Sequence, residues 1–354
     1  MKMSRQIPIQ NIYYMLLYAW DRLPEGTSID VSGVPSPDLP NLLAQVLVDG
    51  TRHILRRGLD RGYVESDEDL SRPRGRILLG DTIKRGLLSR AVVACSVDNL
   101  SHDVLQNRIL KSTLERLATT EDVHAKLRQG LYGTLKSFAD VSFIEITSRD
   151  FGRVEVHGNN AFYRFLLRVC ELIYNSLMPA PGSNRFCFRD VLADSQTMGR
   201  IFQDFIRNFY KLEQRTFLVK ADSFGWPALA QAGYGHYLMP SMNTDVSLHK
   251  DNRCILIECK WTGETFQYRH GSKSLRSEHL YQLYAYLRNH PRSSTKPTLV
   301  EGLLLYPQVD EPVDVAVRLD GHNVNIRTLD LQCDWPRIKD QLMSIIGQPQ
   351  ACPA

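Results

Sequence analysis

Several features that identify common protein classes are missing from this sequence. No apolar run approaches the roughly 18 residues that a membrane-spanning helix requires. Seven cysteines among 354 residues are too few for a disulfide scaffold, and they include no C-x-x-C pair, so a structural zinc site has no motif support. Their odd number and irregular spacing favour reduced thiols in a cytoplasmic protein.

Motifs for nucleotide hydrolysis are also missing. No G-x-x-x-x-G-K-[ST] loop occurs, so we expect this chain itself to bind no nucleotide by that route. The H-E-x-x-H motif of zinc peptidases and the G-x-S-x-G motif of serine hydrolases are absent as well. A function driven by nucleotide hydrolysis at such a loop would therefore need a second polypeptide.

The composition is that of a globular protein with a sizeable core. A length of 354 residues suggests two domains, and 43% of the residues are hydrophobic. The 43 Lys and Arg residues against 39 Asp and Glu residues give a net charge of +4, far from a histone-like excess. The apolar segment 12–20 is rich in Tyr and lacks a small-x-small cleavage site, so we expect a folded helix or strand rather than a signal peptide.

The N-terminal part reads as mixed helix and strand. Residues 41–59 and 103–118 carry apolar side chains at helical spacing, with Asp103 as the expected cap of the second helix. The basic run from Arg72 to Ile77 predicts a turn that leads into a strand. The polar stretch 148–160 predicts a boundary, which divides the chain into an α+β domain over 1–155 and a second domain over 156–354.

The C-terminal part predicts an α/β domain. Helices are expected over 161–177 and 197–213, and two short strands over 244–249 and 253–260 are expected to form a hairpin. A helix over about 275–289, strands over 300–306, 313–319 and 324–329, and a last helix from Trp335 complete the predicted order.

The predicted hairpin carries a compact group of charged residues. Side chains two apart on a strand face the same side, so Glu258 and Lys260 are expected to project together, with Asp245 on the neighbouring strand. Two carboxylates repel each other, and a hard divalent cation such as Mg²⁺, with Mn²⁺ as a substitute, relieves the repulsion. The alternative is that these are ordinary charged residues at strand ends.

The next predicted helix adds Gln282 and Tyr286, four residues apart on one helical face. The order Asp245, Glu258-x-Lys260, Gln282-x-x-x-Tyr286 resembles the PD-(D/E)XK nuclease superfamily and its RecB-like branch. The resemblance implies a mixed central sheet flanked by helices, metal binding by Asp245 and Glu258, and a catalytic role for all five residues. In the alternative interpretation, Tyr286 is a core residue and Gln282 faces solvent.

RecB-like nucleases usually carry an additional glutamate on an upstream helix. The corresponding position here is Gln203, with Asp204 beside it. Both are weak candidates for an additional acidic position.

Segments across nearly the whole chain resemble the McrC family of nuclease subunits from McrBC modified-cytosine restriction systems. They are the run from Asn11 to Trp20, the turn from Arg74 to Ile77, the run from Asn107 to Leu114, and the run from Leu304 to Pro307. The resemblance implies a cytoplasmic, Mg²⁺-dependent DNA endonuclease in defence against foreign DNA. Its implied partners are double-stranded DNA and a hexameric McrB-like AAA+ GTPase, which the N-terminal domain would contact and regulate.

Basic residues offer candidate DNA contacts in two regions. Arg269, Lys273 and Arg276 follow the catalytic strand, where contact with phosphates is the favoured interpretation. A denser group between Arg52 and Arg90 is interspersed with acidic residues. A surface that binds DNA phosphates or an acidic partner and a solvated face are equally supported there.

Two functions remain open from the sequence. The first is a metal-dependent endonuclease subunit. The second is a non-catalytic DNA-binding or regulatory subunit of an AAA+ motor with a degenerate nuclease fold, which the missing upstream glutamate favours.

Overall fold

The computed structural model describes residues 7–34, 38–154, 161–179, 186–227, 238–269, 272–291, 299–309 and 311–347. The chain folds into two compact units. The first unit combines residues 1–27, 32–38 and 190–354, and the second combines residues 28–31 and 39–189. Each unit is therefore built from more than one stretch of sequence.

The observed division differs from the predicted boundary between residues 155 and 156. Helix α8 (Ala161–Ser176) packs against α3 (Leu39–Arg57) and α5 (Leu105–Ala118) in the second unit. Helix α1 (Ile9–Ala19) packs against α9 (Ser195–Glu213) in the first unit. Burial of each helix's apolar face decides its unit. In the polar stretch expected to be a boundary, residues 148–153 form helix α7 (Ser148–Arg153) of the second unit.

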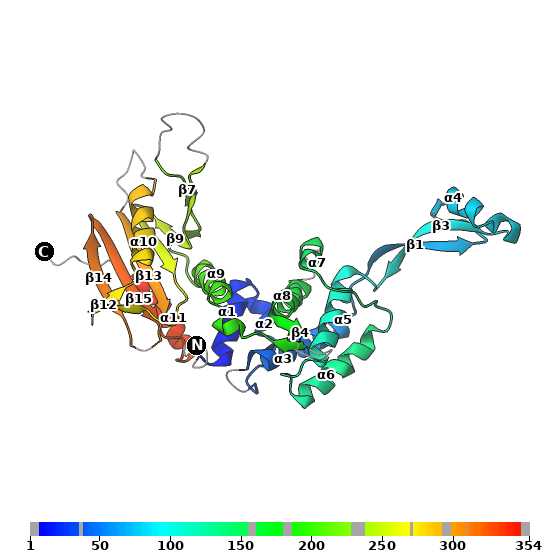
Figure 1. Cartoon of the computed structure of the whole chain (residues 1–354), viewed down its shortest axis with the longest axis horizontal. Coiled ribbons are helices and arrows are strands. Elements are labelled where there is room, and N and C mark those ends of the chain that lie inside the picture. The colour runs from blue at the N-terminus through cyan, green and yellow to red at the C-terminus, as the bar shows by residue number, and fades with distance from the viewer. Residues whose placement is uncertain are drawn as a thin grey trace. The chain divides into compact units, whose positions relative to one another are not determined.

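A six-stranded mixed sheet forms the centre of the first unit, as predicted (Figure 1). Its strand order is β14-β15-β13-β10-β9-β6. The pairs β10–β13 and β13–β15 are parallel, and the other pairs are antiparallel. The strands are β6 (Leu218–Lys220), β9 (Val246–Lys250), β10 (Arg253–Cys259), β13 (Leu299–Pro307), β14 (Asp314–Leu319) and β15 (His322–Leu329).

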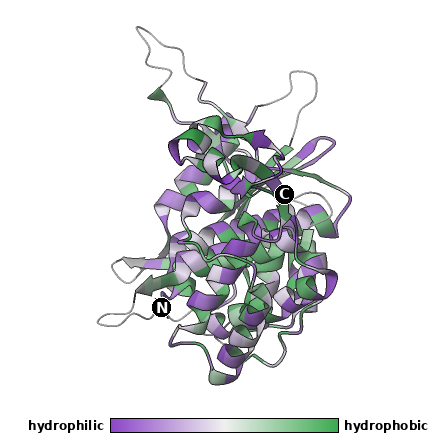
Figure 2. Ribbon diagram, turned by 90° about the vertical axis from the view of Figure 1, so that its right-hand side faces the viewer, coloured by the Kyte–Doolittle hydropathy of each residue, from purple (hydrophilic) through white to green (hydrophobic). Residues whose placement is uncertain are grey.

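Helices cover both faces of this sheet. Helix α10 (Ser277–Asn289) packs on one face, where Leu283 and Leu287 join a buried apolar cluster with Leu256 of β10. Helix α11 (Trp335–Gly347) lies against the other face, and the Tyr210 hydroxyl of α9 donates a hydrogen bond to the Leu342 carbonyl of α11 at 2.8 Å. Single helices carry both hydrophobic and hydrophilic stretches in Figure 2, as expected when one face is buried.

The register of the β9–β10 hairpin fixes which side chains face α10. His249 pairs with Cys254, and Val246 pairs with Ile257. Because side chains alternate between faces, Cys254 and Glu258 share the face of Leu256 beneath α10. The turn passes through Asp251, whose φ of 47° lies in the left-handed region that Asp tolerates better than most residues.

The second unit combines helices with a three-stranded antiparallel sheet, which agrees with the predicted α+β character of this region. The sheet order is β1-β3-β2, with β1 (Gly62–Leu70) paired along its length with β3 (Val93–Ser101), and β2 (Arg76–Ile77) beside β3. Helices α3, α5, α8 and α6 (Ala125–Leu135) pack on one another. Asp103 does not cap α5 as expected, because its carboxylate instead accepts hydrogen bonds from Arg108 and Ser142.

Shorter elements complete the described chain. They are α2 (Leu23–Gly26), α4 (Leu79–Lys84), α7 (Ser148–Arg153), η1 (Leu87–Arg90), η2 (Lys136–Phe138), η4 (Val191–Ala193), β4 (Leu177–Pro179), β5 (Phe186–Phe188), β7 (Ser223–Phe224), β8 (Met242–Asn243), β11 (Phe266–Arg269) and β12 (Ser272–Leu275). Among the described helices, none has the length and apolar character needed to cross a membrane.

Candidate functional site

The β9–β10 hairpin brings two carboxylates together. Asp245 immediately precedes β9, and its Oδ2 accepts a hydrogen bond from the Cys259 backbone N–H at 2.8 Å. This bond anchors Asp245 beside the end of β10, next to Glu258. The negative charge of Asp245 therefore acts on Glu258 and is one of the causes that raise the Glu258 pKa.

Glu258 is a buried acid with one unpaired oxygen. Only 2% of the residue is exposed. Its Oε1 accepts a hydrogen bond from Lys260 Nζ at 2.8 Å, whereas its buried Oε2 has no hydrogen-bond partner within the described part of the chain. Burial, followed by the charge of Asp245, raises the Glu258 pKa to about 7, and Lys260 opposes this rise. An unsatisfied buried carboxylate oxygen is costly, so it marks a place suited to a cation.

A chain of hydrogen bonds connects Lys260 to α10. Lys260 Nζ also donates to Gln282 Oε1 at 2.7 Å, and Gln282 Nε2 donates to the Tyr286 hydroxyl at 2.9 Å. These bonds connect Glu258, Lys260, Gln282 and Tyr286, and Asp245 is held beside them by its bond to the Cys259 N–H. The structure thus brings the five residues singled out in the sequence close together. Tyr286 is 8% exposed and belongs to the apolar cluster, so its ring is a core residue while its hydroxyl supports the site.

The residues of this group fit a hard divalent cation. Burial raises the Asp245 pKa as it does that of Glu258, so the two acids do not readily carry two negative charges without compensation. Mg²⁺ prefers one or two carboxylates and completes its coordination with water and substrate oxygens. The unpaired Glu258 Oε2 beside Asp245 supplies that kind of donor set.

The two weak candidates on α9 differ in their relation to the site. Asp204 forms an ion pair with Arg207, whose Nη1 donates to the Asp245 carbonyl at 3.3 Å. The charge of Asp204 contributes to the raised Asp245 pKa. Gln203 is half-buried on the same helix. Of the two, Asp204 is therefore the residue that contacts the site, because its ion-pair partner Arg207 binds the Asp245 backbone.

The candidate DNA-binding residues are engaged in ion pairs where their side chains are described. Lys273 pairs with Glu311, and Arg276 lies 3.8 Å from Glu264 and 3.9 Å from Glu278. The side chain of Arg269 lies outside the described part of the structure. In the N-terminal group, ion pairs join Arg74 to Glu68, Arg76 to Glu65, and Arg85 to Asp69. This pairing favours a solvated, charge-balanced face there over a continuous phosphate-binding surface.

Two residues near the site were not singled out in the sequence. His279 lies one helical turn before Gln282, and its Nδ1 is 3.0 Å from the Tyr306 hydroxyl. Burial, followed by the charge of Lys260, lowers the His279 pKa to about 4. Arg207 is the second, through its bond to the Asp245 backbone. The three-residue spacing between His279 and Gln282 places both on one helical face, so the sequence could have indicated His279. No local sequence pattern indicates that Arg207 lies near the site.

Comparisons with known proteins agree on one family. The family model for the McrBC 5-methylcytosine restriction system component matches residues 2–307. The Type IV methyl-directed restriction enzyme EcoKMcrBC of Escherichia coli (strain K12) is 29% identical over 345 residues, covering 97% of this chain and 98% of that protein.

A solved structure shares the fold. It is a chain from the refined half-complex of the tetradecameric assembly of Thermococcus gammatolerans McrB AAA+ hexamers with bound McrC. The two chains match with a TM-score of 0.54 at 16% identity, over 97% of this chain and 79% of that chain.

Proposed function

The chain belongs to the McrBC 5-methylcytosine restriction system component family, and from this premise we propose that it is the McrC-type endonuclease subunit of a modified-cytosine-specific, GTP-driven restriction complex. In this proposal the first unit is a PD-(D/E)XK nuclease of RecB-like motif order. It hydrolyses phosphodiester bonds of double-stranded DNA with Mg²⁺, or Mn²⁺ in its place.

One observation carries the proposal. The buried Glu258 keeps Oε2 without a partner beside Asp245, while its Oε1 is held by Lys260. Charged residues at ordinary strand ends extend into water, so they need neither burial nor this connected arrangement. A buried, unpaired carboxylate oxygen lowers stability, and such a loss is typical of functional sites in which that oxygen takes part in the chemistry.

Each residue has a role in the proposed mechanism. A divalent cation held by Asp245 and Glu258 would neutralise these acids and stabilise negative charge developing on the phosphodiester. Lys260 Nζ orients the attacking water. Gln282 fixes the direction of that amine because Oε1 accepts its hydrogen bond, and Tyr286 holds the Gln282 amide in turn.

A McrB-like AAA+ GTPase hexamer is the proposed partner. Two facts support this assignment: the relative from Thermococcus gammatolerans is described with McrB AAA+ hexamers, and the present sequence lacks a P-loop. The second unit also exposes large apolar side chains on α4 and η1, where Leu79 is 65%, Ile83 69% and Leu88 64% exposed. Exposed apolar groups of this kind are typical of protein-binding surfaces, which supports the N-terminal region as the contact with the partner.

The test measures two activities of the same complex. We expect Asp245→Asn and Lys260→Ala, each assembled with the GTPase partner, to lower cleavage of modified DNA by at least about 10²-fold, because charge stabilisation at the reacting phosphate is lost. Stimulation of the partner's GTPase should be unchanged, since these residues lie in the first unit and the proposed partner contact lies in the second.

Lys220→Ala is the matched control, because Lys220 is an exposed lysine on the edge strand β6 of the same sheet. It should cleave as the unaltered protein does. Full cleavage by Asp245→Asn would contradict the proposal and favour a regulatory subunit with a degenerate nuclease fold.

A further inference from the structure

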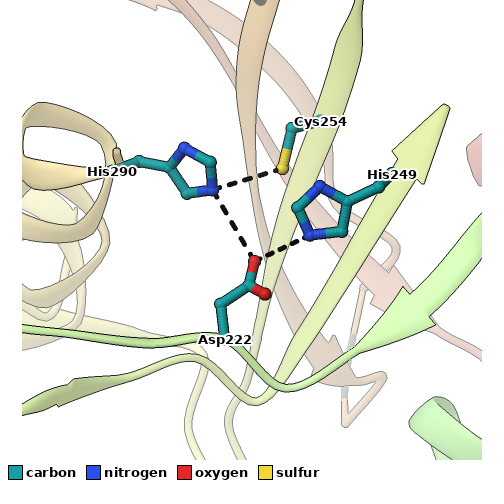
Figure 3. Close-up of side chains that lie close together, drawn as sticks. All are labelled: Asp222, His249, Cys254 and His290. Carbon is teal, nitrogen blue, oxygen red and sulfur yellow. Dashed lines mark hydrogen bonds and ion pairs between the residues drawn. The ribbon is translucent and has the colours of Figure 1, made fainter. Parts of the chain in front are cut away.

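A second group of polar side chains lies on the same sheet face as the candidate nuclease site. Asp222, His249, Cys254 and His290 each direct one potential ligand atom toward a common point (Figure 3). These four atoms all lie within 4.8 Å of one another. His249 Nε2 is 2.8 Å and His290 Nε2 is 3.6 Å from Asp222 Oδ2, and Cys254 Sγ is 3.7 Å from His290 Nε2.

The four residues come from four separate places in the fold. Asp222 lies between β6 and β7, His249 is on β9, Cys254 is on β10, and His290 follows the last residue of α10. Cys254 and His249 are paired across the hairpin. No local sequence motif therefore contains the group, and only folding assembles it.

The donor set is that of a tetrahedral transition-metal site, and two of the printed spacings, 3.6 Å and 3.7 Å, fall in the range that such a site needs. Zinc binds imidazole nitrogen and carboxylate oxygen at about 2.0–2.2 Å and thiolate sulfur at about 2.3 Å, which places neighbouring ligand atoms roughly 3.3–3.8 Å apart. Two imidazoles, one thiol and one carboxylate suit Zn²⁺, whereas Mg²⁺ prefers oxygen ligands alone. We propose that Asp222, His249, Cys254 and His290 bind a structural Zn²⁺ ion, separate from the cation of the nuclease site.

The surroundings hold one ligand in place and leave a path for the ion. The Asp222 backbone N–H donates to Thr244 Oγ1 at 2.8 Å, and the Thr244 N–H donates to the Asp222 carbonyl at 2.9 Å. Supporting bonds of this kind orient metal ligands. Cys254 is fully buried, whereas the side chains of Asp222 and His249 are 20% and 31% exposed, so an ion can enter from their side.

A hydrogen-bond network without metal explains only part of the arrangement. It accounts for the two imidazoles beside Asp222. The remaining contact, between Cys254 Sγ and His290 Nε2 at 3.7 Å, adds little to such a network because a thiol is a weak donor and a weak acceptor. Four convergent ligand atoms from four separate places in the fold are better explained by a shared ion.

The proposed zinc site is distinct from the nuclease site. Cys254 and Glu258 are four residues apart on β10, which corresponds to about 13 Å along a strand. The apolar cluster with Leu256, Leu283 and Leu287 lies on the face between them. A bound ion would tie the end of α10 to β9 and β10, and so hold the helix that carries Gln282. This role does not depend on the proposed nuclease activity.

The first experiment measures metal content. Full-length protein without an affinity tag is desalted, and its bound metals are quantified by mass spectrometry. We expect about one Zn²⁺ per chain, and loss of that zinc in Cys254→Ser and in His290→Gln, because each substitution removes a ligand. Two control variants should keep the zinc. They are Cys333→Ser, which removes a half-buried thiol elsewhere in the first unit, and Asp245→Asn.

The second experiment tests the site in the unaltered sequence, so it does not depend on the folding of a variant. Protein stripped of metal with a chelator is titrated with Co²⁺. A tetrahedral site containing cysteine gives intense visible ligand-field bands and a thiolate-to-cobalt charge-transfer band, which zinc should abolish by displacement. Absence of zinc from the purified protein together with an octahedral cobalt spectrum would overturn the proposal. A charge-transfer band that persists in Cys254→Ser would also overturn this ligand assignment.

Discussion

Glu258 is a residue whose burial lowers the stability of the fold while it suits the carboxylate to the proposed chemistry. Its carboxyl group is buried next to another acid, which raises its pKa to about 7, and only one of its oxygens is paired. Lys260 compensates part of this cost through its 2.8 Å contact. Removing one partner of a buried pair usually destabilises more than the pair itself contributes. The loss of Lys260 should therefore affect both folding and cleavage, so the fold of Lys260→Ala has to be checked alongside its activity.

At the same scale, His279 gives a pH prediction. Burial lowers its pKa from 6.5 to about 4, so the unfolded chain binds a proton at this residue at a higher pH than the folded chain does. Stability from this group is therefore present above pH 6.5 and is lost as the pH falls toward 4. When the pH falls from about 7 to about 5, the free energy of unfolding of the unaltered protein should decrease by on the order of 1 kcal/mol more than that of His279→Gln. The difference is no larger because His279 is partly exposed and solvent screens its charge.

The measurement is urea unfolding of both proteins across this pH range in a chelator, followed by circular dichroism. Glutamine retains a polar group that can still meet the Tyr306 hydroxyl, which His279 now contacts at 3.0 Å. Parallel pH dependence of the two unfolding free energies would show that His279 does not titrate as its burial implies.

Among the elements, α10 and β10 hold the candidate site together because they pack closely. β13 contributes Gly302 beneath α10, where a Cβ atom would lie 3.0 Å from Leu283 Cδ2 and 3.1 Å from Leu287 Cδ1. A glycine at this position lets the helix approach the sheet. The approach matters for function because Gln282, on the same helix, must reach Lys260 at 2.7 Å.

We therefore expect Gly302→Val to push α10 away from the sheet. Overpacking of this kind should cost about 1–3 kcal/mol of stability. Cleavage should fall further than the folded fraction does, because the hydrogen bond between Gln282 and Lys260 is lengthened. Thermal unfolding and nuclease assays on the same preparation measure the two effects.

Gly199→Ala in α9 is the matched control. Among the described residues, its added Cβ would meet only the Trp261 Cβ, at an ordinary 3.9 Å, and alanine favours the helix by up to about 1 kcal/mol. If Gly302→Val retained full stability and full cleavage, close packing of α10 would not be what positions Gln282.

On the scale of the whole molecule, α1 and the segment just before α11, which are far apart in the sequence, pack together in the first unit. Asn11 Nδ2 on α1 donates to the carbonyls of Leu331 at 2.8 Å and Cys333 at 2.9 Å. Trp335 stacks on Tyr14 and Tyr18, with ring centroids 4.8 Å and 5.5 Å apart. The first helix is thus part of the unit that carries the candidate nuclease site.

Leu16→Ala tests this division. Leu16 is 1% exposed on α1, and its truncation should cost about 2–5 kcal/mol. Hydrogen exchange followed by mass spectrometry should show faster exchange in α9 and α11, with α5 and α8 unchanged. Ile54→Ala, which truncates a residue of α3 that is 3% exposed, should give the reverse pattern. Equal acceleration in both units after either substitution would mean that they unfold as one.

Sequence alone determined the features that depend on near neighbours. The periods of strands and helices predict the hairpin, the shared face of Glu258 and Lys260, and the shared helical face of Gln282 and Tyr286. The structure brings these four side chains together. The helices over 161–177 and 197–213 were also predictable, because amphipathic spacing is a local property.

Tertiary structure alone decided where those elements belong and which distant side chains meet. Helix α1 belongs to the first unit and α8 to the second because of the apolar faces against which each packs. The polar stretch near residue 150 does not indicate this assignment. Asp222 and His290 are far apart in the sequence and lie in no metal-binding motif, yet both reach the group around Cys254. Such contacts arise from burial and register across many elements, so no local pattern of residues encodes them.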